Sequence, residues 1–277
     1  MPLVPEDQVT TEEVKGWQGV HLLFFDYSLC SRKVKLVLEL KRIPFTERRL
    51  SPQELRTPWY LGINPRGLVP ALVDDGAVVI ESNDILAHLE ARFPALQPRL
   101  MAAAEEDSAA AAATAVYLQT QDGYHMDIRT LTFKQRFPAM MLVQMAKAKV
   151  AAMDLEESIA VIQDVAGAGG QGRAEQRAWY AAVVAQRGIP DTQVADSVAR
   201  LRTALAAFDA DYATREYLVG GALSMADVAI WVDFERLLAV APRGSFAPAQ
   251  EFPALAAAFD RLAARVSPPA AGRCSCS

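Results

Sequence analysis

The first third of the chain alternates short apolar runs with amphipathic stretches. The continuous apolar run at 20–25 predicts a buried strand, because it is too short for an amphipathic helix. Apolar residues spread between basic ones over 31–42 predict a helix. Ile43-Pro44 ends it, since proline disfavours helical geometry in the residue before it. Residues 45–50 predict a second strand.

The pattern continues with a hairpin and another helix. Apolar runs at 69–73 and 77–80 flank an Asp-Asp-Gly turn signal. Ser82 is the candidate N-cap of the helix that follows. The order strand, helix, strand, loop, strand, strand, helix predicts a mixed sheet covered by helices.

Beyond residue 95 strand signals vanish and alanine-rich helical periodicity takes over. Helices are predicted over about 101–165, 173–187, 192–214, 224–240 and 252–266. The glycine-rich segment 166–172 predicts a flexible loop between helices. We therefore predict an N-terminal extension (1–19), a mixed α/β domain (20–93), a proline-stiffened linker (94–100), an all-helical domain (101–267) and a disordered tail (268–277).

Composition narrows the class of protein. Of the 277 residues 52% are apolar and 22% are charged, which is ample for packed cores. The net charge of −5, without a basic stretch, argues against nucleic-acid binding. No apolar run approaches the ~18–20 residues that cross a bilayer, and the polar, acidic start carries no export signal, so we expect a cytoplasmic protein. Three cysteines cannot form a closed disulfide framework, and metal-ligand spacing is absent, so no metal is expected.

Five motifs follow one another along the chain. They are Tyr27-Ser28-Leu29-Cys30-Ser31-Arg32-Lys33-Val34-Lys35, then Asn64-Pro65-Arg66-Gly67-Leu68-Val69-Pro70-Ala71-Leu72, Glu81-Ser82-Asn83-Asp84-Ile85-Leu86, Leu218-Val219-Gly220-Gly221-x-x-Ser224-Met225-Ala226-Asp227 and Phe252-Pro253-x-Leu255. In this order they resemble the motifs of the cytosolic glutathione transferases, and the first is similar to the Ser-Ser-Cys-Ser-x-x-Val-Arg stretch of the zeta class. The resemblance spans about 20–266. It implies a thioredoxin-like N-terminal domain (βαβ–ββα), an all-α C-terminal domain, glutathione as co-substrate and a homodimer.

Ser28 is the first candidate for activating the glutathione thiol. A helix N-terminus favours an anion, and a free thiol titrates near ~8.5, so a hydroxyl donating to sulfur there would lower the thiol pKa. The resemblance to serine-using classes puts this role on Ser28, whereas the alternative is a plain helix cap. Cys30 is the second choice, through a mixed disulfide favoured by Arg32 and Lys33, and Tyr27 is the third.

The resemblance also assigns the rest of the glutathione site. A cis bond before Pro70 would expose the Val69 backbone to pair with the cysteinyl part of glutathione, the alternative being an ordinary strand-start proline. Glu81 would take the γ-glutamyl ammonium group and Ser82 the carboxylate, the alternative being a helix-starting acid and cap. Candidates for the glycyl carboxylate lie within 53–66, with no residue matched.

A polar and aromatic stripe recurs at helical spacing early in the helical domain, and it is expected to line the second-substrate pocket or, alternatively, a dimer interface or solvent. Its members are Tyr117, Gln121, Tyr124, His125 and Arg129. Residues 121–190 exceed what the family core needs and are expected to reshape this pocket or the subunit contact. Ser224 and Asp227 form a capping box, to which we assign a structural role only.

These features predict a glutathione transferase that activates the thiol of glutathione for attack on an electrophilic, hydrophobic or aromatic small molecule. One alternative is a glutathione-dependent cis-trans isomerase of the maleylacetoacetate type. Another is a binding or regulatory protein that kept the fold without turnover.

Overall fold

The computed structural model describes residues 3–100, 108–162 and 171–266. The chain divides into two compact units. The first comprises 1–118, 211–235 and 254–277, and the second comprises 119–210 and 236–253. These units do not coincide with the predicted domain limits, which stay a prediction.

The first unit contains a four-stranded mixed sheet in the order β2-β1-β3-β4. Its strands are β1 (Val20–Phe24), β2 (Phe45–Arg49), β3 (Ala71–Asp74) and β4 (Ala77–Ile80). β1 is parallel to β2 and antiparallel to β3, and β3 is antiparallel to β4. The predicted mixed sheet and thioredoxin-like topology are therefore confirmed.

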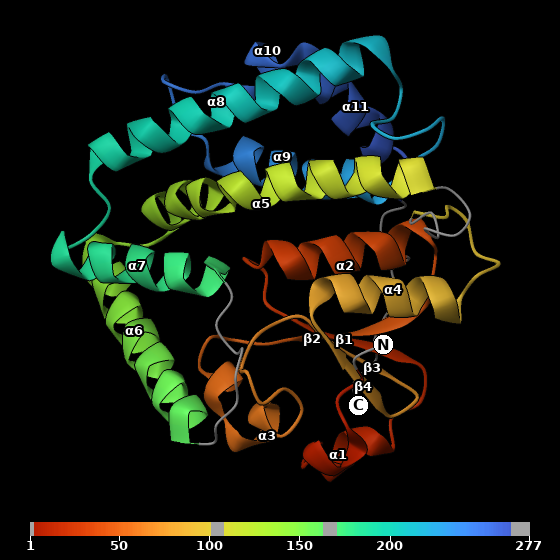
Figure 1. The fold of residues 1–277 in the computed structure, drawn as a ribbon, viewed down its shortest axis with the longest axis vertical. Helices are drawn as coiled ribbons and strands as arrows, with labels where there is room; N and C mark the ends of the chain where they lie inside the picture. The colour runs from red at the N-terminus through yellow and green to blue at the C-terminus, as the bar shows by residue number, and fades with distance from the viewer. Residues whose placement is uncertain (1–2, 101–107, 163–170, 267–277) are drawn as a thin grey trace, which may run out of the picture. The chain divides into compact units, whose positions relative to one another are not determined.

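Helices cover both faces of this sheet (Figure 1). The helices α2 (Leu29–Leu40) and α4 (Ser82–Arg92) pack on one face, and the short helices α1 (Glu12–Lys15) and α3 (Pro58–Leu61) lie on the other. The 3₁₀ turn η1 (Glu6–Gln8) precedes α1, and the 3₁₀ turn η2 (Glu54–Arg56) lies between β2 and α3. Side chains alternate across a strand, so Leu22 joins the core under α2 while Leu23 joins the core on the opposite face.

Two predicted helix starts differ from the observed ones. α2 begins at Leu29, two residues before the predicted start, with Ser28 as its N-cap. The prediction of Ser82 as the N-cap of α4 is wrong, because Glu81 holds that position and Ser82 is the first helical residue. Glu81 has φ 67° and ψ 120°, outside the helical region, so the helix can start only after it.

The residues predicted as an N-terminal extension are part of the first unit. The Val4 N–H donates to the Val78 carbonyl at 2.9 Å, which covers the outer edge of β4. Val9 and Val14 are buried in the core beside α3. The extension therefore completes the sheet and its core.

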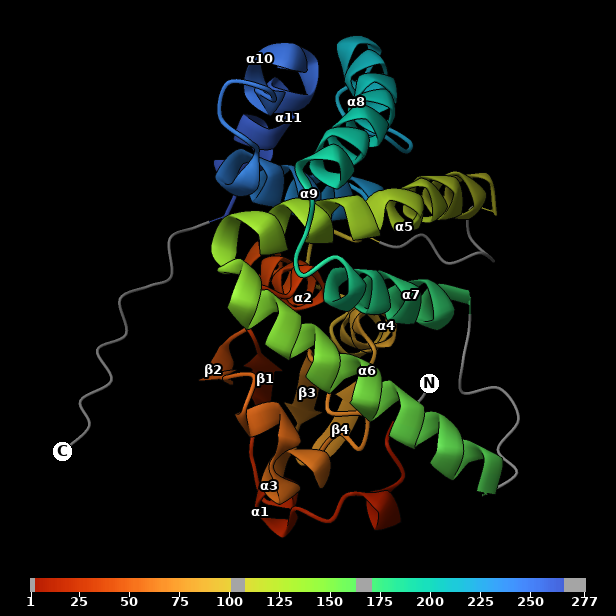
Figure 2. The ribbon, with the colours of Figure 1, turned by 90° about the vertical axis from the view of Figure 1, so that its left-hand side faces the viewer.

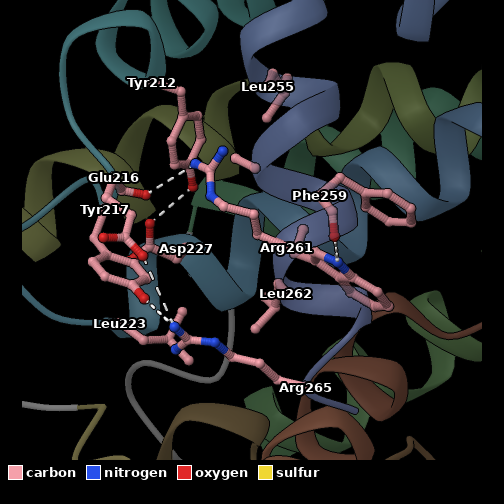
Figure 3. A pocket seen from close by; sticks show the side chains of 12 residues that line it. Tyr212, Glu216, Tyr217, Leu223, Asp227, Leu255, Phe259, Arg261, Leu262 and Arg265 are labelled. Carbon is pink, nitrogen blue, oxygen red and sulfur yellow. Dashed lines mark hydrogen bonds and ion pairs between the residues drawn. The ribbon is translucent and has the colours of Figure 1, made fainter.

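The helical part of the first unit is organised around Asp227, near the start of α9 (Met225–Val240) (Figure 3). Asp227 Oδ2 accepts from the Ser224 N–H at 2.8 Å and from its hydroxyl at 2.6 Å. Asp227 Oδ1 accepts from the Tyr212 hydroxyl and the Leu218 N–H, both at 2.9 Å. The predicted capping box is confirmed, and it also ties α9 to the preceding loop. In the same unit α11 (Pro253–Ala263) stacks Phe259 on Trp231.

The remaining helices are α5 (Ser108–Arg136), α6 (Ala139–Ile162), α7 (Gln171–Ala185), α8 (Asp191–Thr214) and α10 (Pro248–Glu251). The helix predicted over 101–165 is two helices, because Pro138 breaks it after Phe137. Residues 166–170 of the predicted glycine-rich loop and the predicted tail lie outside the described residues. In the second unit α6 and α7 pack together around a shared apolar cluster (Figure 2).

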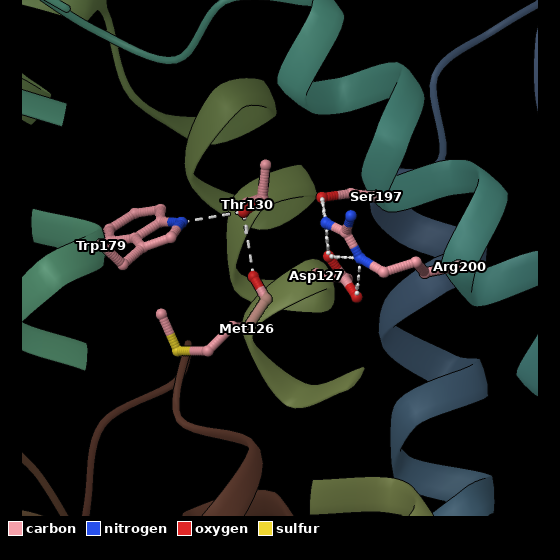
Figure 4. A network of polar contacts seen from close by, with 6 residues as sticks. All are labelled: Met126, Asp127, Thr130, Trp179, Ser197 and Arg200. Carbon is pink, nitrogen blue, oxygen red and sulfur yellow. Dashed lines mark hydrogen bonds and ion pairs between the residues drawn. The ribbon is translucent and has the colours of Figure 1, made fainter. Parts of the chain in front are cut away.

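A buried polar network joins three helices of the second unit (Figure 4). Asp127 on α5 accepts from Arg200 Nη2 at 2.6 Å and from the Ser197 hydroxyl at 2.9 Å, both on α8. On the same turn of α5, Thr130 Oγ1 accepts from the Trp179 indole N–H of α7 at 2.9 Å. The hydrogen bonds to Asp127 raise the pKa of Arg200, and they fix how α8 packs on α5.

Candidate functional site

The register of the sheet brings three chain segments to one edge. Leu23 of β1 lies opposite Ala71 of β3, which in turn lies opposite Ile80 of β4. The end of β1, the start of β3 and the end of β4 therefore lie next to one another at the same end of the strands, which we call the sheet edge that carries the site. The loops that carry the predicted glutathione-binding residues leave from these three strand ends.

A side-chain hydrogen bond links the helices that start at this edge. Lys33 Nζ, in the second turn of α2, donates to Asn83 Oδ1, in the first turn of α4, at 2.8 Å. Lys33 is buried, so its ammonium group is held between the two helix starts. Both helix N-termini point their unpaired N–H groups toward this edge, which favours an anion there.

Ser28 stands at the first of these helix starts. Its Oγ accepts the Ser31 N–H at 3.1 Å, so Ser28 does act as the N-cap of α2. A hydroxyl group has one proton to donate besides its acceptor lone pairs, and the cap bond uses only an acceptor position. Capping therefore orients the oxygen and leaves its proton available for a ligand.

The two competitors of Ser28 have different surroundings. Cys30 lies in the first turn of α2 and is partly buried. Tyr27 is 40% exposed, and its ring packs edge-on against Phe25 with centroids 5.3 Å apart. Both lie within two residues of Ser28, and the choice among the three stays a prediction.

The bond between Val69 and Pro70 is cis, as the sequence predicted. It lies directly before β3, with Pro70 buried and Val69 partly buried. This places the Val69 backbone at the common edge, beside the end of β1.

Glu81 and Ser82 form the junction of β4 and α4. A non-glycine residue with φ of 67° is uncommon and strained, and such residues concentrate at functional sites. The Glu81 carbonyl accepts the Ile85 N–H at 2.9 Å, which closes the first turn of the helix. The strained backbone turns the Glu81 carboxylate away from the helix, while the Ser82 N–H lies at the positive end of α4.

Sequence reasoning missed a partner of Glu81. Arg66 Nη1 forms an ion pair with Glu81 Oε1. The loop that carries Arg66 is held by buried Asn64, whose Oδ1 accepts the Arg66 N–H at 3.0 Å and whose Nδ2 donates to the Leu68 carbonyl at 2.8 Å. The motif that contains Arg66 was recognised in the sequence, whereas the pairing of Arg66 with Glu81 depends on the tertiary structure.

In the predicted second-substrate stripe, Tyr117 belongs to the first unit. Its hydroxyl donates to Asp211 Oδ2 at 2.8 Å. Burial, together with the Asp211 carboxylate, raises the pKa of Tyr117 to about 12. Tyr117 is therefore neutral at physiological pH and bonded within its own unit.

The other stripe residues belong to the second unit. Gln121 and Tyr124 are buried, and the Tyr124 ring packs on Phe208 with centroids 6.2 Å apart. Arg129 lies 5.8 Å from the Tyr180 ring centroid, and His125 is partly buried. Much of this stripe is therefore used in packing within its own unit. The second-substrate pocket remains a prediction.

A separate hollow in the first unit is lined by residues of α8, α9 and α11 (Figure 3). Its walls include Trp231 and Phe259, and its rim carries Arg261 and Arg265. Both arginines bond within the rim, Arg261 to the Glu216 carbonyl at 3.3 Å and Arg265 to the Tyr217 hydroxyl. This hollow is distinct from the edge of the sheet that carries Ser28 and Glu81.

The described part of the chain offers neither a metal site nor a membrane span. Over 3–100, 108–162 and 171–266, no group of three or more His, Cys, Asp or Glu side chains is arranged to hold a metal ion. Within the same ranges no helix is long and apolar enough to cross a membrane.

The fold and the sheet edge define a thioredoxin-like domain that presents helix N-termini and a cis-proline loop, followed by helices. Family models of the glutathione S-transferase N-terminal and C-terminal domains match residues 27–92 and 177–261. The chain belongs to the cytosolic glutathione transferase superfamily.

Among curated relatives, the maleylacetoacetate isomerase of Pseudomonas aeruginosa is 38% identical over 81 residues, which are 27% of this chain and 37% of the relative. The zeta-class glutathione S-transferase of Euphorbia esula is 42% identical over 69 residues, 24% of this chain and 31% of the relative. The matched region thus spans about a third of the length of these relatives.

Solved structures are similar over nearly the whole chain. The β-etherase LigF from Sphingobium sp. strain SYK-6 is 25% identical with a TM-score of 0.65, covering 89% of this chain and 96% of that one. A glutathione transferase family member from Pseudomonas fluorescens, with two glutathione molecules bound, is 19% identical with a TM-score of 0.61, covering 93% of this chain and 94% of that one. The second similarity shows the fold alone.

Proposed function

We propose that this protein binds glutathione at the sheet edge and activates its thiol for attack on an electrophilic carbon of a hydrophobic or aromatic molecule. The observation that carries the proposal is the position of the Ser28 hydroxyl. It caps α2 through its oxygen and keeps its proton to donate at a helix N-terminus. A thiolate is the anion that both the hydroxyl and the helix end would stabilise.

The remaining site residues support glutathione as the thiol. The backbone of Val69 would pair with the cysteinyl residue, as an added strand pairs with a sheet edge. Glu81 would hold the γ-glutamyl ammonium group and Ser82 the carboxylate at the start of α4. Because glutathione would be held in this way, the translational and rotational entropy of its encounter with the second substrate would already be lost on binding, and the attack of the thiolate would not have to include that loss.

In a conjugation the sulfur forms a bond to carbon and the carbon loses its leaving group with the bonding electron pair. The similarity to the β-etherase supports ethers as one substrate class, with the oxygen side of the cleaved C–O bond as the leaving group. The similarity to the maleylacetoacetate isomerase supports a second candidate, in which the thiolate adds to a double bond and is then eliminated. Product analysis separates the two, because conjugation consumes glutathione and isomerisation returns it.

The test compares Ser28→Ala with Ser28→Thr, which retains a hydroxyl group. We expect Ser28→Ala to raise the pKa of the bound thiol toward ~8.5 and to lower kcat/KM at neutral pH by at least about tenfold. Ser28→Thr should recover much of the loss. Thiolate absorbance of bound glutathione against pH gives the pKa, and conjugation of a generic aryl electrophile gives the rate.

Loss of the helix cap alone needs its own control. Ser51→Ala removes the same kind of hydrogen bond, from a backbone N–H three residues on to a serine hydroxyl, since Ser51 Oγ accepts the Glu54 N–H at 3.2 Å. It should leave the thiol pKa and the rate unchanged. If Ser28→Ala behaved like Ser51→Ala, the mechanism would be refuted, and Cys30→Ser and Tyr27→Phe would identify the group that acts instead.

A further inference from the structure

The ion pair between Arg66 and Glu81 lies at the proposed γ-glutamyl position. Both side chains are 49% exposed, so a ligand can reach either charge. Arg66 comes from the loop before β3 and Glu81 from the junction of β4 and α4. The site therefore presents a guanidinium and a carboxylate side by side at the positive end of a helix.

Both members of the pair rise from constrained backbone. Next to Arg66, Gly67 has φ of +58°, and a Cβ there would lie 2.9 Å from the Leu55 carbonyl oxygen. Asn64 closes the same turn, because its carbonyl accepts the Gly67 N–H at 2.9 Å. Glu81 is held at φ of 67°. An exposed ion pair usually contributes little free energy, because two mobile side chains must be ordered to form it. Here the backbone turns that carry the two side chains are already fixed by other contacts.

We infer that Arg66 is a specificity-determining residue that reads the α-carboxylate of the γ-glutamyl group while Glu81 reads its ammonium. The inference rests on the proposed function and adds to it. The α-carbon of that group carries an ammonium group and a carboxylate group. Glu81 has the charge opposite to the ammonium, and Arg66 has the charge opposite to the carboxylate. A carboxylate has about four acceptor positions, so Glu81 can hold the ligand ammonium without releasing Arg66.

This arrangement selects the zwitterion as a whole. A ligand that has the ammonium but lacks the carboxylate can bind only to Glu81, whose charge is already paired with Arg66, and it forms no interaction with Arg66. A ligand with the carboxylate but no ammonium still gains the guanidinium. Arg66 therefore favours the carboxylate-bearing ligands and disfavours the bare amine.

The experiment measures dissociation constants by titration calorimetry for three probes: glutathione, an analogue lacking the α-amino group, and an analogue lacking the α-carboxylate. The proteins are the full chain and its Arg66→Ala and Arg66→Lys variants. Arg42→Ala is the matched control, since Arg42 is an exposed arginine just after the C-terminal end of α2, the end of that helix opposite Ser28.

We expect Arg66→Ala to weaken glutathione and the deaminated analogue by about tenfold each, the size of one lost charge-assisted hydrogen bond. The decarboxylated analogue should bind as well as before or more tightly. Arg66→Lys should recover part of the loss, because lysine restores the charge without the planar fork. Arg42→Ala should change none of the three constants.

An equal loss for all three probes would mean that Arg66 only maintains the loop, and the inference would be overturned. A glutathione constant within twofold of the parent value would overturn it as well. In both cases the proposed function would stand, because the parent protein binds glutathione. If the parent protein did not bind glutathione, the proposed function and the inference would fail together.

Discussion

Replacing Asp227 with alanine should cost more stability than a typical buried substitution. Its carboxylate is 3% exposed and accepts four hydrogen bonds, two from the backbone N–H groups of Leu218 and Ser224 and two from the hydroxyls of Ser224 and Tyr212. Hydroxyls can rotate to other acceptors, but the two N–H groups cannot. At about 2 kcal/mol for each orphaned donor, Asp227→Ala should lower the free energy of unfolding by about 4 kcal/mol.

The assay is urea unfolding followed by far-ultraviolet circular dichroism. Asp227→Asn keeps one acceptor oxygen but turns an NH₂ group toward donors, so a loss of about 2 kcal/mol is expected. Tyr212→Phe should cost only about 1 kcal/mol, because it removes one donor. The double variant Asp227→Ala with Tyr212→Phe should be less destabilised than the sum, since the hydrogen bond between Tyr212 and Asp227 is lost in each single variant and can be lost only once.

Asp260→Ala is the control, because Asp260 is an exposed acid on α11 of the same unit. Its effect should stay within about 0.5 kcal/mol. If Asp227→Ala cost no more than Asp260→Ala, or if the double variant were strictly additive, the reasoning from orphaned buried donors would be refuted.

Gly67→Ala should lose about 2–3 kcal/mol of stability, through a left-handed φ and a Cβ placed 2.9 Å from the Leu55 carbonyl oxygen. Gly220→Ala, at a similar φ of +62° with no atom within 4 Å, should lose only about 1 kcal/mol in the same urea assay; equal losses would disprove the contact argument. For Tyr117, whose folded pKa is about 12 and whose unfolded value is near 10, stability is unaffected below pH ~10 and falls as pH rises toward 12. Tyr117→Phe should therefore show a shallower alkaline loss of stability, and an unchanged slope would contradict the assigned pKa.

Much of the fold could be predicted from local patterns. β1 to β4, α2 and α4 were visible because apolar periodicity and turn signals act over a few residues. The N-cap of α4 was missed since it depends on the φ of Glu81 at the junction with β4, which no local sequence pattern encodes. The break at Pro138 carried a local signal that the alanine-rich periodicity masked.

In the candidate site, too, some features follow from local sequence and others depend on the tertiary structure. By itself, the sequence determined that helices begin near Ser28 and Ser82 and which motifs lie beside these starts, because caps, turns and hydrophobic period are local. Only the tertiary structure decided that Arg66 pairs with Glu81 across 15 positions of the chain, and that Val4 closes the edge of β4. These pairings follow from strand register, which is set by burying one face of the sheet and not by any neighbouring residue.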